Sequence, residues 1–145
     1  TSLDYSPSDF EFTPRENIFV NKDEVINAIG NTNFIILNSL TADIHEGKNP
    51  RYGRRGKIPS SKNIPFHELL DNKTGKFKPI EELNKMFEKN KITKDKKILN
   101  YCGGGIAASL EAFVLYQLGF EKIVIYDNSL HEWAAIDQTL PMENN

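Results

Sequence analysis

The single cysteine of the chain, Cys102, stands between an apolar run at residues 98–101 and three consecutive glycines. The spacing that follows predicts a helix whose inner face carries Ala107, Leu110, Val114 and Leu118. Glycine lets backbone N–H groups turn toward one point, and the N-terminal dipole of that helix faces the same point. A thiol in this position is expected to ionise readily and to act as a nucleophile.

An alternative interpretation makes Cys102 a small apolar core residue, the commoner fate of a cysteine after a buried strand. A glycine-rich stretch alone is also weak evidence of a site. The combination favours a reactive thiol, because a core cysteine gains nothing from an adjoining loop that costs conformational entropy. We therefore predict Cys102 as the catalytic residue. The predicted anion cradle consists of the backbone amides of Gly103, Gly104, Gly105, Ile106 and Ala107.

Composition restricts the kinds of partner. The chain has 145 residues with 18 basic and 20 acidic side chains, a net charge of −2, so nothing global favours nucleic acid or an anionic membrane. One cysteine excludes an internal disulfide and a multi-thiolate metal site, and histidines at positions 45, 67 and 131 lack ligand spacing. No metal or cofactor is expected. A free thiol fits a reducing compartment, so we expect a cytoplasmic location, and no signal peptide or membrane span is visible.

The order of apolar segments predicts one α/β domain over residues 16–145, preceded by an extended lead-in or linker over residues 1–15. Short apolar runs without alternation fit strands buried on both faces of a mainly parallel sheet. Helices between them make a three-layer arrangement, and the Cys102 loop then lies at the carboxyl end of a strand, where such sheets bind ligands. The expected strands are residues 34–37, 98–101 and 123–126, with a short edge segment at 64–66.

Helix boundaries are also readable. Asn21 with Glu24 three residues later is typical of a capping box, and Gly30 ends the helix that it starts. A second helix begins at Pro79, and the helix after the Cys102 loop ends at Gly119. The inner faces of the first two are predicted to carry Val25, Ile26 and Ile29, and Leu83, Met86 and Phe87.

A polar, basic stretch occupies residues 45–61 and shows no apolar period. Its cationic side chains are Arg51, Arg54, Arg55 and Lys57. A loop of this length inside a compact domain is typical of a functional segment. Composition alone equally allows a solvated basic surface.

Three motifs now give a resemblance to a known family. Residues 56–65 read G-K-I-P-S-S-K-N-I-P, similar to G-H-I-P-G-x-x-N-I-P; residues 101–106 read Y-C-G-G-G-I, similar to Y-C-G-S-G-V; residues 126–133 read Y-D-N-S-L-H-E-W, similar to Y-D-G-S-W-x-E-W. The chain resembles a rhodanese domain, specifically the catalytic C-terminal half of two-domain thiosulfate and 3-mercaptopyruvate sulfurtransferases. The resemblance implies that Cys102 takes a sulfane sulfur from a donor, holds it as a persulfide and passes it to a thiophilic acceptor such as cyanide or a thiol.

The resemblance also implies a donor. Members that prefer 3-mercaptopyruvate have small neutral residues after the cysteine, as here, whereas members that prefer thiosulfate carry cations there. Asn49-Pro50-Arg51 resembles the family's E-P-R segment, so Arg51 is predicted to orient an anionic donor, with Arg54 or Arg55 as substitutes. A protein sulfur acceptor or an upstream rhodanese-like domain are the macromolecular partners that the resemblance suggests.

Several positions depart from the family pattern. The usual D-x-R after the first strand reads Asn38-Ser39-Leu40, and a second substrate arginine falls near Ile44 or His45. These changes affect scaffold and substrate positions rather than the nucleophile. Ser129, after the last strand, is predicted as a turn or cap serine, although in relatives a polar residue there can approach the cysteine loop.

Other functions remain open at this stage. A phosphatase with a C-x5-R loop would need arginine at position 108, which is alanine, so a phosphate dianion would lack its bidentate partner. A binding module without turnover is supported by the changes at positions 38 and 40 and opposed by the retained Cys102 loop. A sulfur carrier, loaded and unloaded by protein partners, is an intermediate case.

Overall fold

The computed structural model describes residues 8–13 and 16–144. Most of the lead-in predicted over residues 1–15 therefore lies outside the described residues. Residues 8–13 form no helix or strand and are exposed to solvent. The division into a lead-in and a domain stays a prediction.

Four parallel strands form the central sheet, as the apolar runs predict. They are β1 (Phe34–Asn38), β2 (Lys62–Asn63), β3 (Lys97–Tyr101) and β4 (Ile123–Ile125), in the spatial order β2-β1-β3-β4. In β1 and β3, Asn38 is paired with Tyr101, and the N–H of Ser39 donates to the Tyr101 carbonyl at 2.9 Å. The residues that follow these two strands therefore leave the same edge of the sheet side by side, which places the Cys102 loop next to Ser39.

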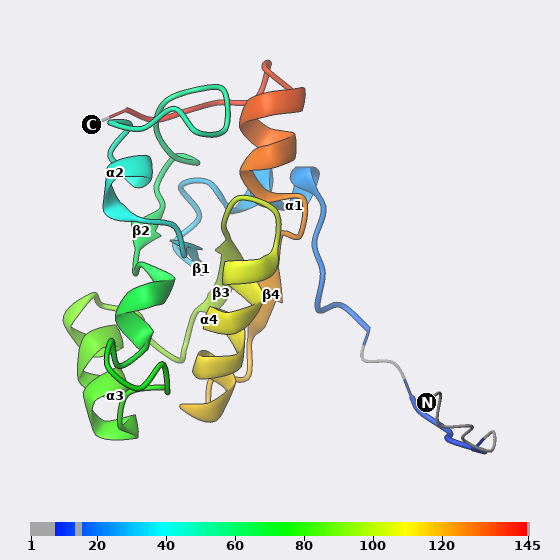
Figure 1. Ribbon diagram of the computed structural model, residues 1–145. Helices are drawn as coiled ribbons and strands as arrows, with labels where there is room; N and C mark the ends of the chain where they lie inside the picture. The colour runs from blue at the N-terminus through cyan, green and yellow to red at the C-terminus, as the bar shows by residue number, and fades with distance from the viewer. Residues whose placement is uncertain (1–7, 14–15, 145) are drawn as a thin grey trace, which may run out of the picture.

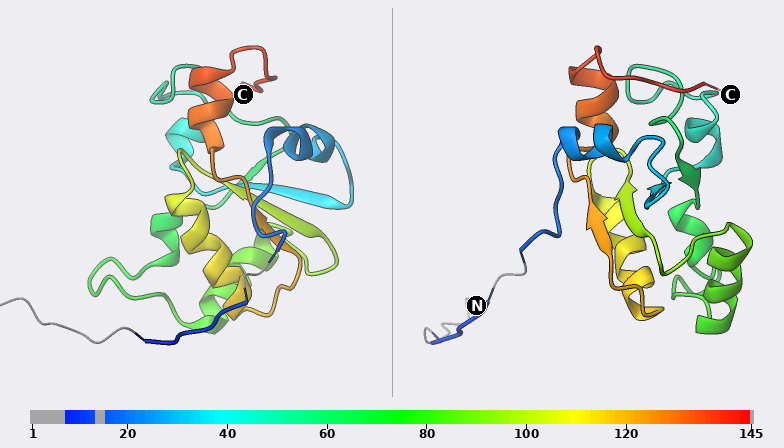
Figure 2. Two further views of the ribbon diagram at one scale, coloured as in Figure 1. Left: turned by 90° about the vertical axis from the view of Figure 1, so that its right-hand side faces the viewer. Right: turned by 180° about the vertical axis from the view of Figure 1, so that it is seen from behind.

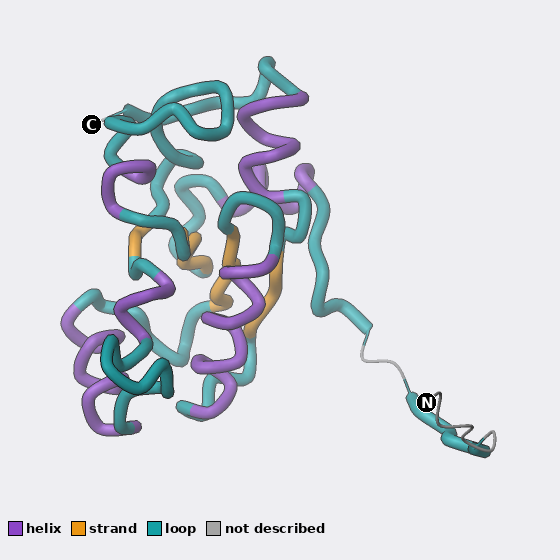
Figure 3. Tube along the Cα trace, viewed as in Figure 1, coloured by secondary structure: helices purple, strands orange, loops and turns teal. Residues whose placement is uncertain are grey.

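Helices cover both faces of the sheet, giving the predicted three layers (Figures 1 and 2). Because side chains alternate along a strand, Ile36 and Leu99 pack with α1 (Lys22–Ala28), whereas Ile35 and Ile98 pack with the opposite layer. That second layer contains η1 (Phe66–Leu69), α3 (Ile80–Lys89) and α4 (Ile106–Gln117). Two further short helices, α2 (Ala42–His45) and η2 (His131–Ile136), lie at the carboxyl end of the sheet among the long loops of Figure 3.

The predicted helix ends are confirmed. Asn21 caps α1 through both bonds of a capping box with Glu24, and Pro79 immediately precedes α3. One facial assignment was wrong: Ile26 is 42 % exposed. The seven-residue α1 is short, and it buries only Val25 and Ala28.

The sequence did not correctly predict every element. The edge strand lies at 62–63 instead of 64–66, because the chain turns at Pro65 into the 3-10 helix η1. Neither α2 nor η2 was predicted, since both are short and have no apolar period of their own. In the described part of the chain, no helix combines the length and the apolarity needed to cross a membrane.

Candidate active site

Cys102 follows β3 directly and is 2 % exposed. Backbone hydrogen bonds hold this residue and its neighbour from the turn after β4. The N–H of Leu130 donates to the Cys102 carbonyl at 3.1 Å, and the N–H of His131 donates to the Gly103 carbonyl at 2.9 Å. The cysteine loop, which we define as residues 102–105, is thus fixed by the start of η2.

Two of the three glycines lie directly against neighbouring side chains. A Cβ on Gly103 would overlap the hydroxyl of Tyr52, and a Cβ on Gly105 would overlap a carboxylate oxygen of Asp127. Gly105 also has a φ of +83°, a conformation that L side chains rarely adopt. Gly104 is exposed, and a Cβ there would meet no atom within 4 Å. Only the middle glycine therefore faces open space.

The N-terminus of α4 lies immediately after this loop. Gly105 is the N-cap residue and provides no side-chain cap, so the first N–H groups of the helix have neither a side-chain cap nor intrahelical acceptors. Together with the helix dipole they suit an anion at the end of β3. This arrangement fits a cradle of amides from residues 103–107, which stays a prediction.

Ser129 contacts the cysteine in addition to forming a turn. Its hydroxyl donates to the Tyr126 carbonyl at 2.7 Å, accepts the Cys102 N–H at 3.0 Å and lies 4.0 Å from the Cys102 sulfur. The predicted turn role is confirmed by the bond to Tyr126. Because the one hydroxyl hydrogen is directed to that carbonyl, the serine acts on Cys102 mainly through the backbone amide.

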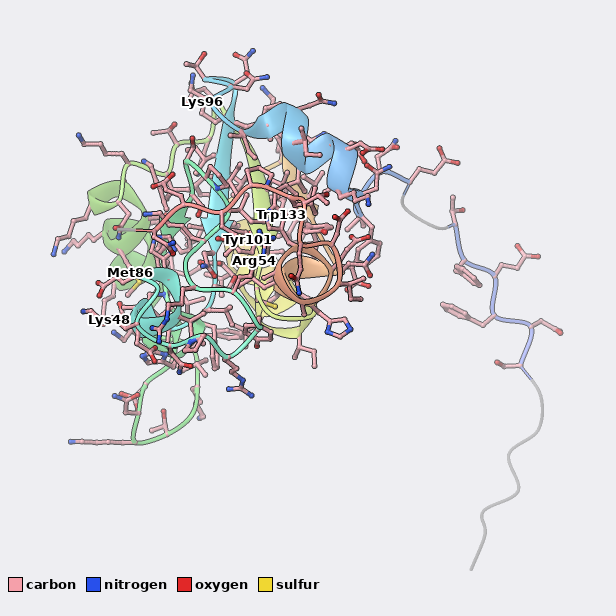
Figure 4. The ribbon with its side chains drawn as sticks, turned by 90° about the horizontal axis from the view of Figure 1, so that it is seen from above. Lys48, Arg54, Met86, Lys96, Tyr101 and Trp133 are labelled. Atoms are coloured by element: carbon pink, nitrogen blue, oxygen red, sulfur yellow. The ribbon has the colours of Figure 1, made fainter. Side chains whose placement is uncertain are left out.

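The three predicted substrate arginines have different surroundings. We call residues 46–61 the approach loop. Arg54 donates to the carbonyls of Trp133, Ala134, Asp137 and Leu140, and Figure 4 shows it beside Trp133. Arg55 donates to the carbonyls of Gly47 and Lys48 at 3.0 and 2.9 Å. The side chains of Arg54 and Arg55 are therefore both held by backbone carbonyl groups.

Arg51 is placed differently. Its guanidinium carbon lies 5.9 Å from the ring centroid of Tyr52, whose hydroxyl abuts Gly103. The structure therefore connects Arg51 to the cysteine loop through one aromatic ring. Which arginine binds a substrate stays a prediction, but the hydrogen bonds of Arg54 and Arg55 serve the loop and η2.

Tyr101 anchors the approach loop, a role that sequence reasoning missed. Its hydroxyl accepts the Ile58 N–H at 3.2 Å and is 2.9 Å from the Ser61 hydroxyl. Burial raises the pKa of Tyr101, so it stays protonated. The approach loop is also paired with the C-terminal segment through reciprocal backbone bonds between Lys57 and Glu143. Both contacts join segments too far apart in sequence to leave a local signal.

A neutral pair lies at the end of β1. The Asn38 amide donates to Nδ1 of His45 at 3.1 Å and accepts the Leu40 N–H at 3.0 Å. Burial, assisted by the positive charge of Lys57, lowers the pKa of His45 to about 4. His45 is therefore uncharged at pH 7, and its Nδ1 acts as an acceptor. The end of β1 therefore carries an uncharged, mutually bonded pair.

Glu111 is the second group that sequence reasoning missed. It lies fully buried on α4 and accepts a hydrogen bond from the Ser39 hydroxyl. Burial raises its pKa to about 8, and its Oε1 has no hydrogen-bond partner among the described residues. The available signal was a glutamate inside the otherwise apolar face of the predicted helix.

The fold and this site define a class of protein. The family model described as a rhodanese-like domain matches residues 22–136. The chain therefore belongs to the rhodanese-like domain family, as its motifs predicted.

Curated relatives show how this domain is used elsewhere. It is 43 % identical over 96 residues to thiosulfate/3-mercaptopyruvate sulfurtransferase 1, mitochondrial, from Arabidopsis thaliana, a match that covers 66 % of this chain and 25 % of the relative. It is 36 % identical over 95 residues to 3-mercaptopyruvate sulfurtransferase from Escherichia coli K12, covering 65 % and 33 %. The sulfur carrier protein TtuD from Thermus thermophilus is 44 % identical over 84 residues, covering 57 % and 29 %. The chain thus spans about a quarter to a third of the length of these relatives.

Among solved structures, the anaerobic ergothioneine biosynthesis enzyme from Chlorobium limicola, in complex with trimethyl histidine, superimposes with a TM-score of 0.82. The match covers 90 % of this chain and 33 % of that one at 18 % sequence identity. At this identity the similarity concerns the fold alone.

Proposed function

We propose that the protein is a sulfurtransferase that carries sulfur as a persulfide on Cys102. The observation that supports this most is the position of Cys102 in a rhodanese-like domain, between the end of β3 and the uncapped N-terminus of α4. A persulfide bears negative charge on its outer sulfur, and amides at a helix N-terminus stabilise such charge. The attacking species is the Cys102 thiolate, as in other cysteine nucleophiles.

In the first half-reaction the Cys102 thiolate attacks the sulfur of 3-mercaptopyruvate. An S–S bond forms and the C–S bond breaks, so that the electron pair leaves on carbon as the enolate of pyruvate, which takes a proton from solvent. In the second half-reaction an acceptor thiolate or cyanide attacks the outer sulfur. The S–S bond breaks and Cys102 leaves as the thiolate, ready for another donor.

A small carboxylate donor is favoured over thiosulfate. Thiosulfate is a dianion that gains most from cations close to the sulfur, whereas the cysteine loop carries only glycines. The Arg51 guanidinium lies over the Tyr52 ring, whose hydroxyl end abuts Gly103, and this placement suits a carboxylate held away from the reacting sulfur. We assign Arg51 to the donor carboxylate and propose a cytoplasmic location, where thiol acceptors are abundant.

A sulfur carrier is the second candidate, because one relative is named a sulfur carrier protein. The persulfide would then be loaded by a protein desulfurase and unloaded onto a protein acceptor. Cys102 and the amide cradle serve both functions equally. The two differ only in whether a small donor loads the thiol.

Intact mass distinguishes these possibilities. The protein is incubated briefly with 3-mercaptopyruvate, with thiosulfate, or with a cysteine desulfurase and L-cysteine, and each sample is measured before and after reduction. We expect a gain of one sulfur, about 32 Da, from 3-mercaptopyruvate, removed by reductant and absent in Cys102→Ser. Loading only by the desulfurase supports the carrier. No loading by any source, while Cys102 still reacts with an alkylating reagent, contradicts both functions.

A further inference from the structure

Tyr52 is the side chain that closes over the cysteine loop. Its ring is half-buried and packs against the core cluster that contains Cys102. Its hydroxyl and the adjacent ring atoms occupy the space that a side chain on Gly103 would need. Any larger residue at position 103 therefore requires Tyr52 to move. The space at position 103 is therefore limited by a residue about fifty positions away in the sequence.

The same ring also contacts Arg51. The guanidinium lies over the Tyr52 ring at 5.9 Å from its centroid, within the range of a cation–π contact. Arg51 is exposed, and a long exposed side chain has many rotamers unless a neighbour restricts it. The Tyr52 ring is such a neighbour, and it also abuts Gly103, the first residue of the predicted cradle.

We infer that Tyr52 is a positioning residue that holds Arg51 at a set place beside the cysteine loop and so selects donors with a carboxylate. This inference deepens the proposed function, on which the identity of the donor rests. The ring acts through the arginine, whereas Gly103 leaves room for the ring. Arg51, Tyr52 and Gly103 therefore form one unit, in which Tyr52 contacts both of the other residues.

The unit is testable without sulfur transfer, by alkylating Cys102 with two reagents that differ in charge. Iodoacetate carries a carboxylate and iodoacetamide is neutral. In both reactions the thiolate forms a C–S bond and iodide leaves with the electron pair of the C–I bond. The ratio of the two second-order rate constants, measured by intact mass at low reagent concentration, reports recruitment of a carboxylate. Changes in the reactivity of the thiol itself cancel in this ratio.

Arg51→Ala and Tyr52→Ala are each expected to lower the iodoacetate-to-iodoacetamide ratio about fivefold. The double variant is expected to fall no further, because both changes remove one coupled unit. Tyr52→Phe, which keeps the ring, is expected to rescue most of the loss. Tyr116→Ala is the matched control, because it removes a half-exposed tyrosine from α4. This variant is expected to keep the iodoacetate-to-iodoacetamide ratio of the unmodified protein.

Variants at position 103 test the inference independently. Gly103→Ala pushes Tyr52 aside and is expected to lower the ratio as Tyr52→Ala does, with no further effect when Tyr52 is already alanine. Gly104→Ala places its methyl in open space and is expected to lower the ratio less. Equal effects of the two alanines, or additive effects of Gly103→Ala and Tyr52→Ala, would overturn the coupling.

The two hypotheses fail separately. If Arg51→Ala lowers the ratio and Tyr52→Ala leaves it unchanged, Tyr52 does not position Arg51, whatever the donor is. If all three members lower the ratio but no donor loads sulfur, the unit stands and the sulfurtransferase proposal is wrong. An unchanged ratio in Arg51→Ala overturns the inference directly.

Discussion

The ends of β1 and β3 lie side by side, yet they are built in opposite ways. After β3, the chain places one thiol among glycines and presents a helix N-terminus. After β1, it buries polar side chains that bond to one another: Asn38 with His45, and Ser39 with Glu111. The β3 end offers backbone to a ligand, whereas the β1 end satisfies most of its hydrogen bonds internally.

This difference shows how the domain separates chemistry from support. His45 and Glu111 are both uncharged at neutral pH, since burial lowers the pKa of the first to about 4 and raises that of the second to about 8. A cation at the end of β1 would compete with the amides of α4 for an anion. The neutral side chains at that end do not compete in this way.

Gly105→Ala is expected to have the largest effect, and it tests the end of β3, where the backbone is offered to a ligand. The methyl would overlap Asp127 and force alanine to a φ of +83°. We expect a loss of about 2–4 kcal/mol in the free energy of unfolding. Sulfur transfer measured at a temperature where the variant is folded should fall about 100-fold.

Gly30→Ala is the matched control for this variant. Gly30 also has a positive φ, +72°, but a Cβ there meets nothing within 4 Å. The Gly30→Ala variant should lose only about 1 kcal/mol in the free energy of unfolding and should keep its sulfur-transfer rate. Equal losses of activity in the two variants would show that positive φ alone, rather than the geometry of the cysteine loop, explains the effect.

The pH dependence of the free energy of unfolding tests the end of β1, where buried side chains bond to one another. Glu111 has a pKa near 4.5 when unfolded and about 8 when folded, so its contribution is complete below pH 4.5 and is lost as pH rises through 8. Between pH 6.5 and 8.5 the free energy of unfolding should fall by about 2 kcal/mol in the unmodified protein. Glu111→Gln, which cannot ionise, should flatten this fall in urea titrations at both pH values.

His45 contributes little over that pH range. The pKa of His45 is lowered by burial, so its contribution is complete above pH 6.5 and is lost as pH falls toward 4. At pH 6.5 the unfolded histidine is half protonated, which adds a rise of only about 0.4 kcal/mol up to pH 8.5, and this rise is the same in Glu111→Gln. A pH slope that persists unchanged in Glu111→Gln would mean that another group titrates, and the neutral character of the β1 end would lose its main support.

Ser129→Ala should have the smallest effect on sulfur transfer. It tests whether the Ser129 side chain takes part in the chemistry or only supports the cysteine loop. The variant leaves the Cys102 N–H without its acceptor and costs about 1–2 kcal/mol in the free energy of unfolding. Because the hydroxyl hydrogen points to Tyr126, we expect sulfur transfer to change less than about threefold. A tenfold loss in a variant of normal stability would make Ser129 a catalytic residue and give the β3 end a side-chain component.

Local patterns in the sequence predicted much of this protein. The capping box at Asn21, the helix start at Pro79 and the apolar strand segments depend on neighbours in the chain, so they are readable without the structure. The same holds for Cys102 and its glycines, because a strand, a tight loop and a helix N-terminus follow one another directly. The family motifs are equally local, and they indicated the rhodanese-like domain.

Tertiary contacts decided what the sequence left open. Three arginines in one loop have the same chemistry, and only their partners separate them: Arg54 lies on the carbonyls around η2, whereas Arg51 lies on Tyr52. The need for glycine at position 103 likewise comes from Tyr52, a residue distant along the chain. Contacts across the fold leave no periodicity or spacing in the sequence. The chain alone therefore suffices to propose Cys102 as the nucleophile, while the groups that surround it required the structure.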